Sequence, residues 1–258
     1  NFRAGVNAGN SIASGGNFNT VVGDEAGTAI TTGDSNSAVG YGALDANTTG
    51  ASNNAVGYDA LGANTTANQN NAFGRFSLGS NTTGADNTAF GQNTLGTNIL
   101  GSKSTAVGSD ALSTQNYASA TDGYNTAVGY VAGTAVTTGR FNTFMGGLAG
   151  DALNTANSNV AIGYSALSTD TKGDNSVAIG ENALLTQNFT TSTDSYNVAV
   201  GSNAGRAVTT GTNNTLIGGL AGDAITDADR NVAVGYEALT TDDLGSRTIA
   251  VGTGAAGQ

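Results

Sequence analysis

Polar, large apolar and small residues follow one another in a fixed order within a five-residue stretch that recurs along the chain. In Asn159-Val160-Ala161-Ile162-Gly163, a large, a small and a large apolar residue stand between asparagine and glycine. A period of two residues predicts a short β-strand, with bulky side chains on one face and alanine on the other. We expect the bulky side chains to fill a thin core, and the glycine to end the strand where a Cβ is forbidden.

The glycine that ends this stretch returns at a short and nearly constant period. Its fourteen copies follow one another in 17-residue steps, except for two 21-residue steps, and Gly5 is a displaced fifteenth copy. A short period kept from end to end indicates a solenoid of stacked coils. The fourteen are Gly23, Gly40, Gly57, Gly74, Gly91, Gly108, Gly129, Gly146, Gly163, Gly180, Gly201, Gly218, Gly235 and Gly252.

The residues between two glycines predict the rest of one coil. An Ala-Leu pair such as Ala43-Leu44, or Ala-Gly, follows three and four residues after the glycine and predicts a second short strand. A turn is expected at Asn47-Thr48-Thr49-Gly50 and its equivalents. The sequence therefore predicts an all-β parallel β-roll, or β-solenoid, of about 14 coils of 17 residues, two of them 21 residues long. Asparagine four residues before most of the glycines predicts a ladder of amides from coil to coil.

A second, longer period lies over the first. Residues 113–184 and 185–256 are the same block of four coils repeated, and each block opens with a four-residue insertion. No break in composition separates them, so we interpret residues 1–258 as a single repeat array. Because the chain starts within a repeat and without methionine, we expect it to be an internal fragment of a longer fibre.

Composition excludes several classes of function. The net charge of −11 disfavours a nucleic-acid partner, which needs a basic surface, and no apolar run is long enough for the segment to be membrane-embedded. The absence of histidine and cysteine removes the common catalytic triads, thiol catalysis and nearly all zinc sites. Glu25, Glu181 and Glu237 are isolated, and Asp170 and Asp174 have the sequence context of solvated turn carboxylates. We therefore expect no enzymatic activity, no metal and no cofactor.

The thin core predicts association between chains. One valine or isoleucine and one leucine per coil bury little apolar surface against the entropy cost of ordering a 17-residue coil. A row of alanine on the other strand face suits the close approach of a neighbour. We expect homo-oligomers in which parallel chains pack together along that alanine row.

The repeated motif resembles that of two known families of fibrous proteins. The stretches Asn159–Ala166, Ser176–Ala183 and Asn231–Ala238 are similar to the head repeats of trimeric autotransporter adhesins of the YadA-like type and to the shaft repeats of phage tail fibres. The resemblance covers essentially the whole chain and implies a homotrimer of left-handed parallel β-rolls. The 17-residue coil is longer than is usual in the autotransporter heads, which favours the tail-fibre branch.

This resemblance implies a passive role outside the cell. The expected function is a structural or adhesive fibre segment, on a virion tail or a bacterial surface, that attaches to a cell-surface glycan or other receptor. An ice-binding solenoid is one alternative, because threonine pairs recur along the chain, and a polysaccharide-cleaving tailspike is the other. The threonine pairs are adjacent and precede glycine, which is typical of turns.

The two insertions are the sequence's candidate binding loops, because they interrupt an otherwise uniform array. Each places aromatic residues among amides and hydroxyls, which is the usual composition of a sugar site, and we expect these aromatics to project from the coil. The alternative is a bulge that only packs. The candidate glycan-binding residues are Gln115, Asn116, Tyr117 and Tyr124 in the first insertion, and Gln187, Asn188, Phe189 and Tyr196 in the second.

Overall fold

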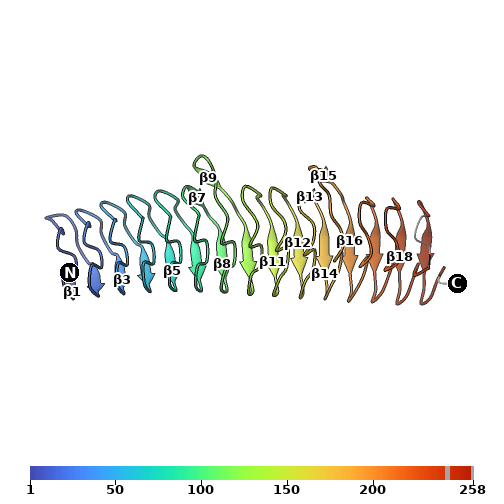
Figure 1. Cartoon of the computed structure of the whole chain (residues 1–258), viewed down its shortest axis with the longest axis horizontal. Coiled ribbons are helices and arrows are strands. Elements are labelled where there is room, and N and C mark those ends of the chain that lie inside the picture. Colours follow the sequence, from blue (N-terminus) through green and yellow to red (C-terminus); the bar gives the residue numbers. More distant parts are fainter. Residues whose placement is uncertain (242–244, 257–258) are drawn as a thin grey trace. The chain divides into compact units, whose positions relative to one another are not determined.

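The chain folds as an all-β parallel solenoid, and the computed structural model describes residues 1–241 and 245–256. It divides into two compact units, Asn1–Asn125 and Thr126–Gln258. Each coil contributes one three-residue strand, and the described residues contain no helix. In Figure 1 the arrows of successive coils follow one another along each unit. The predicted solenoid is confirmed, with the displaced copy at Gly5 adding a coil to the expected fourteen.

The first unit contains seven of these strands, and a second small sheet forms beside its insertion. The three-residue strands pair in the order β1-β2-β3-β4-β5-β6-β8, and β7 pairs with β9. Figure 1 shows β9 on a loop that stands above the neighbouring coils. The strands are β1 (Phe2–Ala4), β2 (Thr20–Val22), β3 (Ser37–Val39), β4 (Asn54–Val56), β5 (Asn71–Phe73), β6 (Thr88–Phe90), β7 (Gly101–Ser102), β8 (Thr105–Val107) and β9 (Thr121–Asp122).

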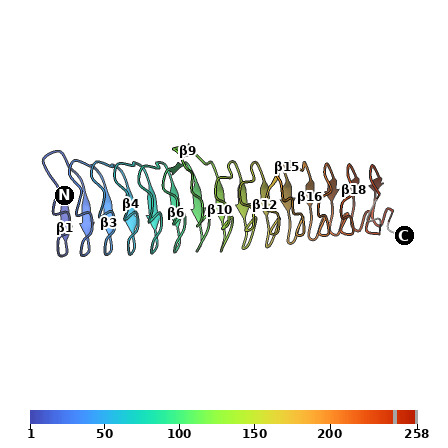
Figure 2. The ribbon, with the colours of Figure 1, turned by 45° about the horizontal axis from the view of Figure 1, so that its top comes forward.

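The second unit repeats the arrangement with eight strands, in the order β10-β11-β12-β14-β16-β17-β18-β19, and with β13 paired to β15. Figure 2, in which the view is turned by 45°, shows the strand arrows of successive coils following one another along the unit. The strands are β10 (Thr126–Val128), β11 (Thr143–Met145), β12 (Val160–Ile162), β13 (Gly173–Asp174), β14 (Val177–Ile179), β15 (Thr193–Asp194), β16 (Val198–Val200), β17 (Thr215–Ile217), β18 (Val232–Val234) and β19 (Ile249–Val251).

Equivalent repeat positions are hydrogen-bonded neighbours throughout each unit. Ala161 of β12 lies beside Ala178 of β14, and Ile162 lies beside Ile179. The pairing is parallel and in register, so each repeat position becomes a row of side chains that runs from coil to coil. Rows, and not single residues, are therefore the units of this structure.

The strand faces are the reverse of those predicted from the sequence. The alanine in the middle of most three-residue strands, such as Ala161, is buried, whereas the flanking Val160 and Ile162 are only partly buried. The interior of a coil is too narrow for a large side chain at every position, so alanine faces inwards and the larger residues face outwards. The prediction that valine fills the core and alanine forms the outer surface was wrong.

The predicted second strand is also absent from the ordinary coils. The Ala-Leu pairs lie in a turn, where leucine adopts a left-handed backbone conformation, as at Leu44 (φ 54°) and Leu167 (φ 53°). Left-handed φ directs the leucine side chain into the coil, where it is fully buried. A second strand pair forms only where an insertion follows, at β7–β9 and β13–β15.

The interior is filled in two alternative ways. Where leucine stands four residues after the repeat glycine, the buried position three residues later is polar, as in Leu61 with Asn64. Where glycine stands there, the later position is apolar, as in Gly150 with Leu153. A Cβ atom on Gly150 would lie 2.5 Å from the Cε1 atom of Phe144, which replaces the usual strand alanine. Side-chain volume is thus exchanged between positions inside one coil.

The repeat glycine is required both by its backbone conformation and by the short distance to the backbone of the next coil. Gly57 has φ of +138°, and a Cβ on it would lie 2.6 Å from the carbonyl oxygen of Gly74 in the next coil. An L-residue is strained at that φ, and the neighbouring backbone cannot move away without breaking the ladder. The sequence prediction for this glycine is confirmed.

The asparagine row is buried and forms a ladder, although most of its bonds join side chain to backbone. The Oδ1 atom of Asn36 accepts from the backbone N–H of Asn53 (3.0 Å), and the Nδ2 atom of Asn53 donates to the carbonyl of Ala67 (2.8 Å). Each side chain therefore joins neighbouring coils and closes its own coil. The predicted amide-to-amide bond occurs in this row between Asn53 Nδ2 and Asn36 Oδ1 (3.2 Å), and a second buried row contains another, in which Asn64 Nδ2 donates to Asn47 Oδ1 (2.8 Å).

Candidate functional site

The outward strand face forms a row of large apolar side chains in each unit. In the first unit these residues directly precede the repeat glycines, and Phe73 and Phe90 stack with ring centroids 4.5 Å apart. The second unit carries aliphatic residues at both outward positions of most strands, for example Val177 and Ile179. In the three-residue strands from β2 to β19, no charged residue occupies an outward position. The row before the glycines is Val22, Val39, Val56, Phe73, Phe90 and Val107, then Val128, Met145, Ile162, Ile179, Val200, Ile217, Val234 and Val251.

Tyrosines border this apolar face. Five of them directly follow repeat glycines, and all five are exposed. The rings of Tyr41 and Tyr58 stack at 5.4 Å. The ring of Tyr164 lies over Gly147, where a Cβ would be 3.6 Å from the ring. These side chains widen the apolar surface while leaving their hydroxyl groups available to water.

The first insertion buries one of its two aromatic residues and exposes the other. Tyr117 is 5% exposed, and its hydroxyl accepts a hydrogen bond from the Nδ2 atom of Asn125 (3.2 Å). Gln115 is fully buried and accepts from the same amide (2.9 Å). Both side chains therefore hold the insertion against its own coil. Asn116 and Tyr124 are exposed.

Tyr124 belongs to a small polar cluster on the surface of the first unit. Lys103 Nζ lies 2.8 Å from Asp122 Oδ2, and the Tyr124 hydroxyl donates to the same carboxylate (3.2 Å). Hydrogen bonds to Asp122 and then to Tyr124 raise the pKa of Lys103. Because the ion pair is exposed, it positions the tyrosine without adding much stability.

The second insertion also buries one aromatic residue and one glutamine, with phenylalanine in place of tyrosine. Phe189 is 6% exposed and Gln187 is fully buried, whereas Asn188 and Tyr196 are exposed. Gln187 accepts from Asn197 Nδ2 (2.8 Å) and donates to Asp170 Oδ2 (2.6 Å). The expectation that the aromatics of both insertions project from the coil is therefore wrong for Tyr117 and Phe189 and holds for Tyr124 and Tyr196.

Asp170 is fully buried beneath the second insertion, although its sequence context predicts a solvated turn. Its Oδ1 atom accepts from the backbone N–H groups of Gly173 (3.0 Å) and Phe189 (3.1 Å). Burial raises the pKa of Asp170, and the hydrogen bonds, that from Gln187 above all, oppose the rise. Asp174 is also buried and accepts from the backbone of Asn157 (2.5 Å). These carboxylates organise loops and do not form an open acidic site.

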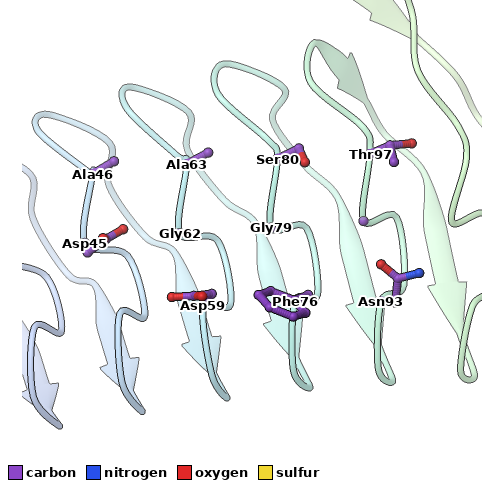
Figure 3. Close-up of a pocket in the computed structure, with 11 residues that line it drawn as sticks. Asp45, Ala46, Asp59, Gly62, Ala63, Phe76, Gly79, Ser80, Asn93 and Thr97 are labelled. Carbon is purple, nitrogen blue, oxygen red and sulfur yellow. The ribbon is translucent and has the colours of Figure 1, made fainter.

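A groove of about 580 Å³ crosses four coils of the first unit. Figure 3 shows three rows of residues along it. Asp59, Phe76 and Asn93 form one wall. The floor contains Gly62 and Gly79, and it continues to Gly96. Asp45 lies in the floor row at one end, and the other wall consists of Ala46, Ala63, Ser80 and Thr97.

Charge and ring packing define the chemistry of the groove. Burial raises the pKa of Asp45, and the negative charge of Asp59 adds to the rise. The ring of Phe76 contacts Tyr58 edge-on, with centroids 5.3 Å apart, and the guanidinium of Arg75 lies 4.8 Å from its centroid. The groove is therefore acidic, with a fixed aromatic ring in one wall.

Sequence reasoning missed this groove, although the chain contains a signal for it. Gly62, Gly79 and Gly96 follow one another at the 17-residue step of the repeat, so they occupy one repeat position in three successive coils. Other coils have side chains there, such as Thr28 and Thr134. Three consecutive losses of a side chain in one row produce a concave surface.

Within residues 1–241 and 245–256, no three acidic side chains are grouped so as to hold a metal ion, and no helix is suited to cross a membrane. In comparisons with known proteins, no family model, no curated protein and no solved structure matches this chain.

Proposed function

We propose that this chain is a segment of a non-enzymatic, homotrimeric attachment fibre that joins a virion or a bacterium to the surface of its target cell. The observation that supports the proposal is the outward strand face, which exposes large apolar side chains in coil after coil. Met145 is 46% exposed and Ile217 is 40% exposed in a single chain. Contiguous apolar surface of this kind marks a protein–protein interface.

The charge distribution supports association of like chains through this face. A chain of net charge −11 repels its copies, yet the outward positions of the three-residue strands are free of charge from β2 to β19. Depletion of charge is characteristic of the centre of an interface. Three parallel chains that turn these faces towards a common axis would bury all three rows, and rotational symmetry would close the assembly.

The oligomeric state is tested by sedimentation velocity of the wild-type chain and two variants. The wild type should sediment as a trimer. Ile217→Asp places a charge on the proposed interface and should yield monomers that keep their β-type circular dichroism. Thr138→Asp, in an exposed turn, is the matched control and should remain trimeric. A wild-type chain that is a folded monomer at micromolar concentration would refute the assembly.

The attachment role places the chain outside the cell and predicts a receptor, which we propose to be a cell-surface glycan. The exposed residues of the insertions, Asn116, Tyr124, Asn188 and Tyr196, are proposed contacts. Alanine at Tyr124 and Tyr196 together should reduce binding of the labelled trimer to cells without dissociating it. Unchanged binding would leave the insertions a structural role only.

The two alternative functions have their own assays. Thr48 Oγ1 donates to the carbonyl of Thr65 (3.0 Å), so the threonine row bonds coil to coil, and this favours a turn over an ice-binding surface. Thermal hysteresis of the purified chain would nevertheless establish ice binding. Release of reducing ends from capsular polysaccharide would establish a cleaving tailspike.

A further inference from the structure

We propose that the groove floored by Gly62, Gly79 and Gly96 binds a neutral or amino-sugar saccharide chain, which would lie along the row of coils. The groove lining includes no outward strand residue and no insertion residue, and at one end Thr97 Oγ1 donates to the carbonyl of Ser113 (2.9 Å), where the first insertion begins. The proposal deepens the attachment function above and rests on it for its biological role, although saccharide binding can be measured directly.

The fold does not require glycine at the centre of this floor. Neither Gly62 nor Gly79 has a positive φ. A Cβ on Gly62 would meet no atom closer than 3.4 Å, and one on Gly79 would lie 3.3 Å from the carbonyl oxygen of Phe76. Thr28 and Thr134 occupy the same repeat position elsewhere. The repeat glycine Gly57, by contrast, could not accept a Cβ at all. Packing therefore does not account for Gly62 and leaves a Cβ on Gly79 only a tight fit, whereas a Cβ on Gly96 would clash with the Asn93 side chain; the first two glycines keep the groove open.

The walls supply the two kinds of contact that a pyranose ring needs. Phe76 offers an apolar surface held in place by Tyr58 and Arg75, which suits the C–H groups of a sugar. The carboxylate of Asp59 has no hydrogen-bond partner among the described residues of the chain, so it is available to accept from sugar hydroxyls. Ser80 and Thr97 lie on the opposite wall, and because the Thr97 hydroxyl already donates to the carbonyl of Ser113 (2.9 Å), it can only accept from a sugar.

Size and charge restrict the ligand further. A volume of about 580 Å³ falls within the range of small-molecule sites. The elongated groove, which crosses four coils, fits a short linear oligomer better than a compact ligand. Asp45 and Asp59 are close enough for their charges to interact, so an acidic sugar would be repelled and an amino sugar favoured.

The test is titration calorimetry of the full chain with four tetrasaccharides: neutral β-linked glucose, N-acetylglucosamine and glucosamine oligomers, and an oligogalacturonate as the acidic probe. At least one of the first three should bind and the acidic one should not. Gly79→Thr, which fills the floor with a side chain found at this position in other coils, should weaken that binding at least tenfold. Asp59→Asn should remove any preference for the amino sugar. Ser168→Thr, at the same repeat position outside the groove, is the matched control and should bind like the wild type.

Each outcome decides the question. Absence of binding by all three probes at millimolar concentration, equal binding by Gly79→Thr, or preference for the acidic oligomer overturns the groove proposal. Circular dichroism melting of Gly79→Thr separates loss of the site from loss of the fold. If Gly79→Thr loses saccharide but still attaches to cells, the groove is a site and is not the attachment site. If the wild type binds saccharide but attaches to no cell, the proposed fibre function fails and the groove stands.

Discussion

The exchange of volume between Phe144 and Gly150 can be tested with a double-mutant cycle. Phe144 is fully buried where other strands have alanine, so Phe144→Ala should lower the free energy of unfolding by about 3–5 kcal/mol through lost burial and a cavity. Gly150→Leu introduces the residue that most other coils have. Its Cβ, however, would lie 2.5 Å from the phenylalanine ring. Overpacking costs roughly 1–3 kcal/mol, and left-handed φ in an L-residue costs about 1–2 kcal/mol more.

The double variant Phe144→Ala/Gly150→Leu should lose less than the sum of the two. The ring that obstructs the leucine is gone, and the leucine fills the space that the ring leaves, as Leu167 does in the next coil. Only the cost of left-handed φ and an imperfect fit then remain, so we expect a favourable coupling of about 2 kcal/mol or more, near the upper end of values for contacting residues.

Guanidinium unfolding at one fixed protein concentration measures the cycle. The control combines Gly150→Leu with Leu216→Ala, which removes another fully buried side chain four coils away, and these changes should add. Additivity to within about 0.5 kcal/mol in the Phe144 cycle itself would mean that the two positions do not share one space. That result would refute our account of the interior.

Three further predictions concern single residues. Gly57→Ala should destabilise the chain by several kcal/mol, because it combines strain at positive φ with a backbone clash, and thermal melting will show it. Asn53→Ala should cost about 2–3 kcal/mol in denaturant unfolding by leaving buried backbone groups unbonded, whereas Asn54→Ala, on the outward face, should cost under about 1 kcal/mol; equal losses would contradict the buried ladder. Because burial raises the pKa of Asp170, the folded state holds its proton more tightly than the unfolded state. The stability of the wild type should therefore fall relative to Asp170→Asn as pH rises above 3.8, the ordinary value; a constant difference across pH 3–7 would exclude such a shift.

The sequence was sufficient to predict the periodic features of the fold. The 17-residue step fixes the parallel register, and an invariant glycine such as Gly57 signals a backbone position that no side chain can occupy. The asparagine row was recognised for the same reason, since a polar residue repeated in a buried row must satisfy its neighbours in each coil. Periodicity therefore encodes what every coil must share.

The sequence was not sufficient to decide which strand face is inside. A period of two residues places Ala199 on one strand face and Val198 and Val200 on the other, but it does not show which face is buried. Hydrophobicity favours valine inside, and that preference misled us. The available width decides the matter, because the turn leucines such as Leu184 already fill the coil and leave room only for a methyl group. That width follows from the left-handed turn, which the sequence pattern did not reveal.

The candidate sites differ from the fold in how they are encoded. A single substitution in a solenoid changes one point, but substitutions at one repeat position in neighbouring coils change a whole row. Gly62, Gly79 and Gly96 form a groove because they occupy one repeat position in three successive coils, whereas an isolated glycine would leave only a small depression.

The two insertions show the same coupling between positions at close range. A Cβ on Gly123 would lie 2.7 Å from the Tyr117 hydroxyl, and the second insertion has Ser195 at this position with Phe189 in place of the tyrosine. Ser195 hydrogen-bonds Ser176 (2.5 Å), so one buried hydroxyl is kept near this place while the residue that supplies it changes. Buried side chains within one coil therefore change together, so that the interior stays filled and hydrogen-bonded. The outward rows are not constrained in this way and can differ from coil to coil. Those rows are where a function that varies along the solenoid has to be encoded.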